Sequence, residues 1–368
     1  MKTKKKYEAY TIYDYLRILP YLDKIDDLAL KLDAINCIVN KDGTLIGYNS
    51  DYYGFKLMLE ANQVVIKDKV VAILGNGGAS KAVYEVVKDM QAKTIYIVDR
   101  NNLSNTISYE EIYNKDLDVI INTTPVGMFP NNDGCIIDVK KFKNLEWVVD
   151  IVYNPIRTKL VIEALNFGIK AIGGLEMLVA QAVKALEFFD GIPVDSNRLK
   201  ACYKKLLNDK QNIVLIGMPS GGKTTIANIL GKKLQREVLE MDDLIVQKIG
   251  MPIRNYIEQF GEEAFRQQEI EMAKELRNHH HTIISCGGGI ILKEESMNYL
   301  KENGCIVFID RDLNKLLISD DRPLSNTQEK LNQLYQQRYD LYRKYSDIII
   351  DNNGDLHDTV DRIIESVG

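Results

Sequence analysis

The residue types best suited to chemistry lie at residues 217–224, which read Gly-Met-Pro-Ser-Gly-Gly-Lys-Thr. The spacing G-x-x-x-x-G-K-[ST] is that of a phosphate-binding loop, whose glycines let backbone N–H groups surround phosphate oxygens. An apolar run at 213–216 precedes the loop and a helix-forming run at 225–234 follows it. Lys223 is expected to reach the β- and γ-phosphates and Thr224 to hold Mg²⁺. A plain glycine turn is the alternative, but the flanking strand and helix favour the phosphate site.

A second glycine-rich turn, Gly-Asn-Gly-Gly-Ala-Ser, lies at residues 75–80. The apolar run 69–74 precedes it, helix-period residues follow to about Met90, and a second apolar run at 94–99 ends in Asp99. A strand, a glycine turn, a helix and a strand that ends in an acid form a dinucleotide-binding βαβ unit. The sequence therefore predicts two nucleotide sites in one chain.

Composition and charge narrow the class of protein. The chain has 368 residues, 45% of them hydrophobic and 27% charged, and a formal net charge of −5. It has no basic excess for nucleic acid or anionic lipid, and no apolar run near the roughly 18 residues that span a bilayer. The five cysteines are scattered and include no C-x-x-C pair, which is typical of reduced thiols. The basic start, 2–6, is not followed by an apolar core, so we expect a cytoplasmic enzyme with no signal peptide, nucleic-acid or membrane partner.

Helical patterns separate most of the predicted strands, which favours parallel sheets covered by helices. The strands are predicted at 69–74, 94–99, 119–122, 147–152, 169–172, 212–216, 237–241, 282–286, 305–310 and 347–351. Long helices are predicted at 174–189 and 261–278, and a polar break lies at 319–326. The fold class is α/β, with a Rossmann-type dinucleotide-binding domain followed by a P-loop parallel α/β domain. The predicted divisions are 1–68, a Rossmann domain at 69–190, a linker at 191–210 and a P-loop domain at 211–368.

The C-terminal part carries further motifs in a fixed order after the phosphate loop. These are Glu240-Met241-Asp242, Gly261-Glu262-Glu263-Ala264-Phe265-Arg266, Gly287-Gly288-Gly289, Arg322-Pro323-Leu324 and Gln337-Arg338-Tyr339. With these motifs, nearly all of residues 211–368 resembles shikimate kinase, whose domain is similar to the nucleoside monophosphate kinases. The resemblance implies transfer of the ATP γ-phosphate to the 3-hydroxyl of shikimate, with Mg²⁺, in aromatic amino acid biosynthesis.

The chemistry accounts for the residue types in these motifs. Paired guanidiniums from Arg266 and Arg338 suit the shikimate carboxylate. Asp242 can orient the hydroxyls and accept the departing proton. Arg322, in the lid, can stabilise the charge on the transferred group. The resemblance implies ATP binding by Gly217, Met218, Pro219, Ser220, Gly221, Gly222, Lys223, Thr224, Thr225 and Arg322, and shikimate binding by Asp242, Arg266, Gly287, Gly288, Gly289 and Arg338.

Two departures from the kinase family concern the metal and the nucleotide. The family has Asp-x-Asp where this chain has Glu240-x-Asp242. A longer carboxylate can still organise Mg²⁺ through water, so this departure bears on metal affinity more than on catalysis. The lid is short and has no clear counterpart of the arginine that stacks on adenine in the family, so we expect modest nucleotide affinity.

Residues 18–190 resemble shikimate dehydrogenase without its beginning. The matching stretches are 33–36, 47–51, 75–79, Asn122-Thr123-Thr124-Pro125-Val126-Gly127-Met128, Asp150-Ile151-Val152-Tyr153-Asn154-Pro155 and 177–181. The resemblance implies a shikimate pocket lined by Asn36, Asp51, Tyr153 and Gln181, with Asp51 as acid/base. It implies cofactor contacts at Gly75, Gly77, Gly78, Ala79, Thr123 and Met128.

Two features of this half differ from the dehydrogenase family. The clamp for the cofactor's 2′-phosphate is Asn-Arg-Thr in the family and Asp99-Arg100-Asn101 here. Arg100 favours NADP, whereas Asp99 suits the free hydroxyls of NAD, and we favour NADP. At the front, where residues 1–68 match only a remnant of the substrate domain, Tyr15 takes the position of the family's lysine. A neutral phenol cannot supply that lysine's charge at neutral pH.

The prediction that follows is a working shikimate kinase fused to an impaired dehydrogenase-like domain. One alternative is a truly bifunctional shikimate dehydrogenase and kinase, and another is a regulator that senses shikimate or nucleotide without turnover. A different phosphoryl acceptor, such as a nucleoside monophosphate, is disfavoured by the paired arginines. We expect a monomeric kinase domain and a dehydrogenase-like half that can dimerise. The residues His279-His280-His281 are expected to form an exposed turn, not a metal site.

Overall fold

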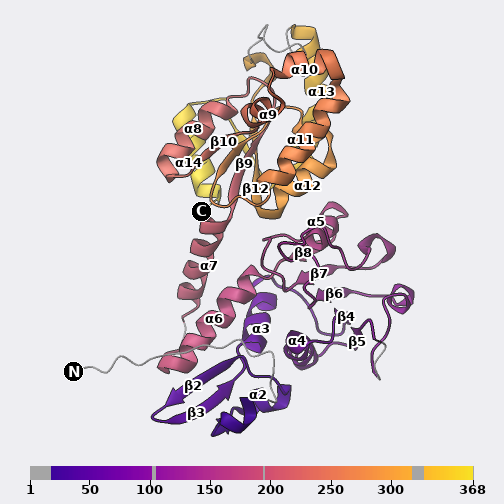
Figure 1. Ribbon diagram of the computed structural model, residues 1–368, viewed down its shortest axis with the longest axis vertical. Coiled ribbons are helices and arrows are strands. Elements are labelled where there is room, and N and C mark those ends of the chain that lie inside the picture. The colour runs from indigo at the N-terminus through magenta and orange to yellow at the C-terminus, as the bar shows by residue number, and fades with distance from the viewer. Residues whose placement is uncertain (1–17, 102–104, 194, 317–326, 368) are drawn as a thin grey trace, which may run out of the picture. The chain divides into compact units, whose positions relative to one another are not determined.

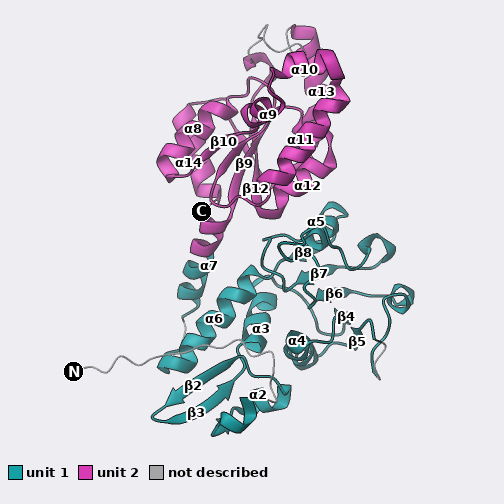
Figure 2. Ribbon diagram, viewed as in Figure 1, with its two compact units in different colours: residues 1–203 teal, residues 204–368 magenta. Residues whose placement is uncertain are grey.

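The computed structural model of the chain describes residues 18–101, 105–193, 195–316 and 327–367 (Figure 1). The chain divides into two compact units, residues 1–203 and residues 204–368 (Figure 2). Helix α7 (Ser196–Lys210) runs across the boundary between them. Within the described residues, no helix is long and apolar enough to cross a membrane.

Unit 1 is built on a five-stranded parallel sheet with the order β5-β4-β6-β7-β8. The strands are β4 (Val70–Leu74), β5 (Thr94–Val98), β6 (Val119–Asn122), β7 (Trp147–Asp150) and β8 (Lys170–Ile172). The helices are α2 (Asp27–Leu32), α3 (Asp51–Ala61), α4 (Gly78–Asp89), α5 (Lys159–Asn166) and α6 (Leu175–Asp190), with short 3₁₀ turns η1 (Leu19–Tyr21), η2 (Glu111–Asn114) and η3 (Val139–Lys141).

Both faces of this sheet are buried, which is why its strands read as continuous apolar runs. Alternate residues of β4 point to opposite faces. Val71 and Ile73 lie in a core with α3 and α4, whereas Ala72 and Leu74 lie in a core with α5. The apolar run of this buried parallel strand thus places the glycine turn 75–80 directly after the end of β4.

The segment before β4 forms a small sheet of its own, with the order β1-β3-β2. Strand β1 (Lys24–Ile25) pairs in parallel with β3 (Thr44–Tyr48), and β2 (Cys37–Lys41) pairs with β3 in antiparallel. Asp42 and Gly43 make the hairpin turn with positive φ angles of 52° and 92°, the conformation that Asp-Gly favours. Helix α3 then leads from this sheet toward β4.

Unit 2 has a second five-stranded parallel sheet, with the order β10-β11-β9-β12-β13. The strands are β9 (Asn212–Ile216), β10 (Val238–Glu240), β11 (Ile283–Ser285), β12 (Gly304–Asp310) and β13 (Ile348–Asp351). The helices are α8 (Lys223–Leu234), α9 (Met241–Ile249), α10 (Ile253–Phe260), α11 (Glu262–Leu276), α12 (Glu294–Asn303), α13 (Gln328–Tyr345) and α14 (Leu356–Val367), with 3₁₀ turns η4 (Ile290–Leu292) and η5 (Leu313–Lys315).

Helices cover both faces of the second sheet (Figure 1). Ile213 and Leu215 of β9 pack with α8 and α14, whereas Val214 and Ile216 pack with α11, α12 and α13. The predicted strands are therefore confirmed in both units, with ends that differ by two residues or fewer. The α/β class with two five-stranded parallel sheets is confirmed as well.

The segment 191–210, expected to be a linker, is mostly helix. Gly191 ends α6 in the left-handed conformation, and α7 begins five residues later. Side chains from later in unit 2 contact the backbone carbonyls at and just after the C-terminus of α7. Arg236 donates to Gln211 and Asn208 at 2.9 Å each, and the Nδ1 atoms of His280 and His281 lie 3.2 Å and 2.9 Å from the carbonyls of Lys210 and Asn208. The Arg236 guanidinium at a helix C-terminus is stabilising, so the last turn of α7 is held within unit 2.

Candidate functional site

The phosphate loop joins β9 to α8 and has the backbone that a phosphate cradle requires. Gly217 and Gly222 have φ angles of 148° and 90°, values that residues with a side chain rarely adopt. A Cβ at Gly217 would lie 2.7 Å from the carbonyl oxygen of Ile309. Both predicted glycines are therefore required by conformation, and the first also by packing.

Two side chains of this loop project from the start of α8. The Lys223 ammonium is buried and donates to the carbonyls of Gly217 and Met218 at 2.9 Å and 3.0 Å, so it lies inside the loop. The Thr224 hydroxyl donates to Glu240 Oε2 at 3.3 Å. Within the described residues, Glu240 Oε1 is buried without a hydrogen-bond partner, and burial raises the pKa of this carboxyl. The Thr224 hydroxyl and the Glu240 carboxylate oxygen without a partner are oxygen ligands of the kind that Mg²⁺ prefers, either directly or through water.

The glycine triplet 287–289 lies where any side chain would collide with its neighbours. A Cβ at Gly287 would lie 2.5 Å from Asp242 Oδ1, and one at Gly288 would lie 2.8 Å from Pro219 Cδ. A Cβ at Gly289 would overlap the Arg266 guanidinium. The triplet therefore brings backbone against the three side chains that sequence motifs had singled out separately.

Two buried arginines point toward the triplet, each from a helix on one face of the sheet. Arg266 of α11 donates to Glu262 at 2.7 Å and to Glu269 at 2.6 Å. Arg338 of α13 donates to the carbonyl of Gly288 at 3.0 Å. The Nε atoms of both arginines are buried and, in the described part of the chain, have no hydrogen-bond partner. Because an unsatisfied buried donor costs about 1–3 kcal/mol, these atoms are suited to an anionic ligand.

Glu269 is a buried charged residue of this site that sequence reasoning missed. It is 2% exposed, and burial raises its pKa to about 7 against the opposing effect of the Arg266 guanidinium. The signal was present, because residues three apart on a helix share a face and Glu269 follows Arg266 by three. Glu269 holds the Arg266 side chain in place with a short bond to Nη1.

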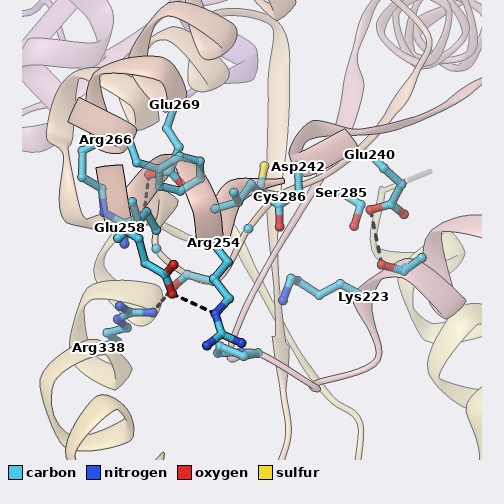
Figure 3. Close-up of a pocket in the computed structure, with 18 residues that line it drawn as sticks. Lys223, Glu240, Asp242, Arg254, Glu258, Arg266, Glu269, Ser285, Cys286 and Arg338 are labelled. Carbon is cyan, nitrogen blue, oxygen red and sulfur yellow. Dashed lines mark hydrogen bonds and ion pairs between the residues drawn. The ribbon is translucent and has the colours of Figure 1, made fainter. Parts of the chain in front are cut away.

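These groups surround one cavity of about 410 Å³ (Figure 3). It is lined by Pro219, Lys223, Thr224, Glu240, Asp242, Ile253, Arg254, Ile257, Glu258, Phe265, Arg266, Glu269, Ser285, Cys286, Gly287, Gly288, Gly289 and Arg338. Arg254 and Glu258, an i,i+4 pair on α10 with Nε and Oε1 3.0 Å apart, were not expected here. Arg322, the predicted lid residue, lies outside the described residues.

The glycine turn of unit 1 is more open than the phosphate loop. Gly75, with a φ of 103°, would place a Cβ 2.8 Å from Thr124 Cγ2 and 3.0 Å from Thr123 Oγ1. Gly77 and Gly78 have no heavy atom within 4 Å of a Cβ position, and Ala79 follows in the first turn of α4. A pyrophosphate can therefore approach the turn and the N-terminus of α4 closely.

The predicted shikimate-pocket residues of unit 1 come partly together. Asn36 and Ser50 exchange hydrogen bonds, with Ser50 N donating to Asn36 Oδ1 at 2.8 Å and Asn36 Nδ2 donating to Ser50 Oγ at 3.1 Å. Asp51 is next in the chain, and burial raises its pKa to about 6 although a hydrogen bond from Asn36 opposes the shift. A Cβ at Gly54 would lie 2.9 Å from Gln181 Cβ, so α6 carries Gln181 against the first turn of α3.

The other predicted residues of unit 1 lie on loops at the carboxyl ends of strands. Tyr153 follows β7 and is 46% exposed, and Met128 follows β6 and is 41% exposed. Thr123 donates to the carbonyl of Leu74 at 2.8 Å, which ties its loop to the end of β4. After β5, Asp99 Oδ1 accepts a hydrogen bond from the backbone of Asn101 at 2.7 Å, with Arg100 between them.

Comparison with known proteins finds different relatives for the two parts of the chain. A family model described as shikimate kinase matches residues 219–368. Shikimate dehydrogenase (NADP(+)) of Clostridium beijerinckii is 39% identical over 201 residues, which are 52% of this chain and 74% of that protein. The enzyme of the same name from Methanococcus maripaludis is 36% identical over 219 residues, 54% of this chain and 76% of that protein.

A solved structure resembles the N-terminal part as well. It is a chorismate mutase/shikimate 5-dehydrogenase fusion protein from Clostridium acetobutylicum, with 35% identity and a TM-score of 0.52. The match covers 54% of this chain and 76% of that one. The chain thus spans about three quarters of the length of the dehydrogenases that it matches.

Proposed function

Because this chain belongs to the shikimate dehydrogenase family and carries a shikimate kinase domain at residues 219–368, we propose that unit 2 phosphorylates the 3-hydroxyl of shikimate with ATP and Mg²⁺. Both domain types belong to the shikimate pathway of aromatic amino acid biosynthesis. The observation that carries the proposal is the single cavity in which Lys223, Asp242, Arg266 and Arg338 meet the glycine triplet.

The carboxylate of shikimate binds at the guanidiniums of Arg266 and Arg338. Their Nε atoms are buried donors that a carboxylate can satisfy, and bidentate pairs of this kind are strong and directional. Glu269 is the positioning residue for Arg266, because its carboxylate holds Nη1 at 2.6 Å. The triplet at 287–289 leaves room for the substrate ring, since a side chain there would fill the space beside Asp242 and Arg266.

The phosphoryl group is transferred at the other end of the cavity. Lys223 exchanges its two carbonyl partners for oxygens of the β- and γ-phosphates, and backbone N–H groups at the start of α8 bind the rest. Asp242 accepts the proton of the attacking hydroxyl. Thr224, with Glu240 behind it, holds Mg²⁺, which when bound neutralises charge on the phosphate oxygens. Arg322 is proposed to add a further cation from the lid.

For unit 1 we propose binding of NADP at the 75–79 turn with little or no oxidation of shikimate. The support is Tyr15, which stands where the dehydrogenase family has its lysine and cannot replace that charge at neutral pH. A bifunctional enzyme is the second candidate and fits the relatives equally well. Asp51 favours it, because a buried carboxyl with a pKa of about 6 suits proton transfer near neutral pH. We also propose that unit 2 is monomeric by itself and that the full chain self-associates through unit 1. Sedimentation of the full-length protein measures this self-association.

The test of the kinase proposal is formation of shikimate 3-phosphate by the full-length protein with ATP–Mg²⁺. Arg266→Lys should mainly raise the KM for shikimate, because a point charge replaces a planar fork that Glu269 and Glu262 already hold. The KM for ATP should stay within about twofold. A folded protein that binds nucleotide and yet gives no shikimate 3-phosphate would exclude the proposal.

A further inference from the structure

Three loops of unit 2 meet at the carboxyl edge of its sheet, where ligands bind in open parallel α/β folds. The phosphate loop follows β9, the turn 311–315 follows β12, and the loop at Asn352 and Asn353 follows β13. Strands β9, β12 and β13 are adjacent in the sheet, so the three loops are neighbours although they lie far apart in the sequence. Sequence motifs had identified only the first of them.

A chain of hydrogen bonds ties the three loops together. Asn352 donates to the carbonyl of Gly221 at 2.8 Å, and its own backbone N–H donates to Asp310 at 2.7 Å. Asn353 Oδ1 accepts from the backbone of Asp312 at 2.9 Å, and its carbonyl accepts from Lys315 Nζ at 3.0 Å. The turn after β12 is thus fixed relative to the phosphate loop.

Arg311 begins this turn, and its guanidinium lies beside the phosphate loop. A Cβ built at Gly222 would be 3.9 Å from Arg311 Nη1 and 3.1 Å from Asn352 Nδ2. Gly222 is the residue that caps the N-terminus of α8, immediately before Lys223. The guanidinium is therefore next to the backbone N–H groups that a phosphate-binding loop offers to its ligand.

The charge of Arg311 is available to a ligand. Its Nε donates to the carbonyl of Lys315 at 3.3 Å, a bond that orients the guanidinium. Among the described residues, neither Nη atom donates a hydrogen bond and no carboxylate pairs with the side chain. The neighbouring acids have other partners: Asp310 accepts from the Tyr339 hydroxyl, and Asp351 accepts from the backbone of Asn353.

We propose that Arg311 binds the polyphosphate of the nucleotide, as a second cation beside Lys223. The planar fork of a guanidinium matches two phosphate oxygens, and the hydrogen-bonded turn holds it in place before the ligand arrives. The inference rests on the proposed function only in that the 217–224 loop binds ATP. It assigns a nucleotide-binding role to an arginine of the turn after β12, which no sequence motif had singled out.

The test compares three variants of the full-length protein, Arg311→Gln, Arg311→Lys and Arg343→Gln. Arg343 is an exposed arginine of α13 that lies over the Tyr339 ring and serves as the matched control. For Arg311→Gln we expect the Kd for ADP and the KM for ATP to rise at least about tenfold, or about 1.4 kcal/mol. The KM for shikimate should change less than twofold. Arg311→Lys should recover part of the affinity, because it keeps the charge, and Arg343→Gln should behave as the unchanged protein.

An unchanged Kd for ADP in a folded Arg311→Gln protein would overturn the inference. So would an equal rise in the KM for shikimate, because the effect would then be a general disturbance of the unit. An Arg311→Lys protein no better than Arg311→Gln would show that charge at this position does not matter. If the unchanged protein binds ADP but does not phosphorylate shikimate, the proposed function fails, and the ADP measurements still decide the role of Arg311.

Discussion

The two glycine loops of this chain have the same position in their sheets but different surroundings. Each follows an interior strand of a five-stranded parallel sheet and leads into a helix. In unit 2 the loop is enclosed, since Gly217 abuts Ile309 and Gly222 faces Asn352 and Arg311. In unit 1, Gly77 and Gly78 have open space around them. A loop enclosed on several sides suits a compact triphosphate, whereas an open turn suits a dinucleotide that lies along the sheet edge.

The carboxylates that are proposed to accept or donate a proton also differ between the two units. Asp242, the group that is proposed to take a proton, shares its cavity with the cations of Lys223, Arg266 and Arg338. Glutamates line this cavity as well, at positions 240, 258 and 269. Asp51 is buried, and among the described residues only a hydrogen bond from Asn36 opposes the rise of its pKa to about 6. Unit 2 thus brings cations and a carboxylate together for its proposed chemistry. In unit 1, the predicted partner of Asp51 is Tyr15, which lies outside the described residues.

The largest expected effect is on the kinase. Asp242→Asn should lower shikimate phosphorylation by about 10²–10⁴-fold, the range typical of a positioned acid/base group. Asp243→Asn is the matched control, because this neighbour is exposed on the same turn of α9 and does not line the cavity. Turnover of purified full-length variants at saturating ATP and shikimate measures the difference. Equal activity of the two variants would remove Asp242 from the mechanism.

The next prediction concerns the dehydrogenase-like unit. At alkaline pH, NADPH formation from shikimate by the full-length protein should be at least about 100-fold slower than the enzyme median of about 10 s⁻¹. Tyr15→Lys, which restores the charge found in the family, should raise the rate. A rate of shikimate oxidation within tenfold of that median would show that unit 1 is an active dehydrogenase and that the protein is bifunctional.

The stability of unit 1 should respond to the charge of Asp51. Because burial raises the pKa of this carboxyl from 3.8 to about 6, the folded unit binds the proton more tightly than the unfolded chain does. Its contribution to stability is therefore present below pH 4 and is lost as the pH rises through 6. Asp51→Asn removes this loss, so it should stabilise unit 1 by about 1–3 kcal/mol at pH 7 and by little at pH 4. Urea unfolding at the two pH values measures the difference, and a gain of equal size at both would contradict the cause.

The smallest expected effect is on cofactor choice. If Arg100 binds the 2′-phosphate, NADP(H) should bind at least about tenfold more tightly than NAD(H). Arg100→Gln should abolish the preference, whereas Lys93→Gln, at the opposite end of β5, should keep it. Titration of both cofactors against the full-length variants decides the question. A preference for NAD(H) in the unchanged protein would mean that Asp99 dominates.

The positions of both nucleotide loops were predictable from the sequence because the constraints that define them are local. A buried parallel strand needs an unbroken apolar run such as 213–216, and the turn after it needs glycine at positive φ. The strands of both sheets were placed for the same reason. Residues 191–210 were predicted as a linker from the break at 190–193 and their polar composition. That composition did not predict the helix α7, whose last turn is held by side chains distant in sequence, Arg236, His280 and His281.

What the sequence by itself determined is the type of each nucleotide site and the residues at its loop. The tertiary structure alone decided which further groups lie beside these residues. The order of the strands brings the turn at Arg311 and the loop at Asn352 beside Gly222, and brings the triplet 287–289 against Asp242 and Arg266. No local pattern specifies strand order, because it results from how whole helices and strands pack. For this reason the loop and the shikimate motifs could be read from the sequence, whereas Arg311 and Asn352 beside the loop required the fold.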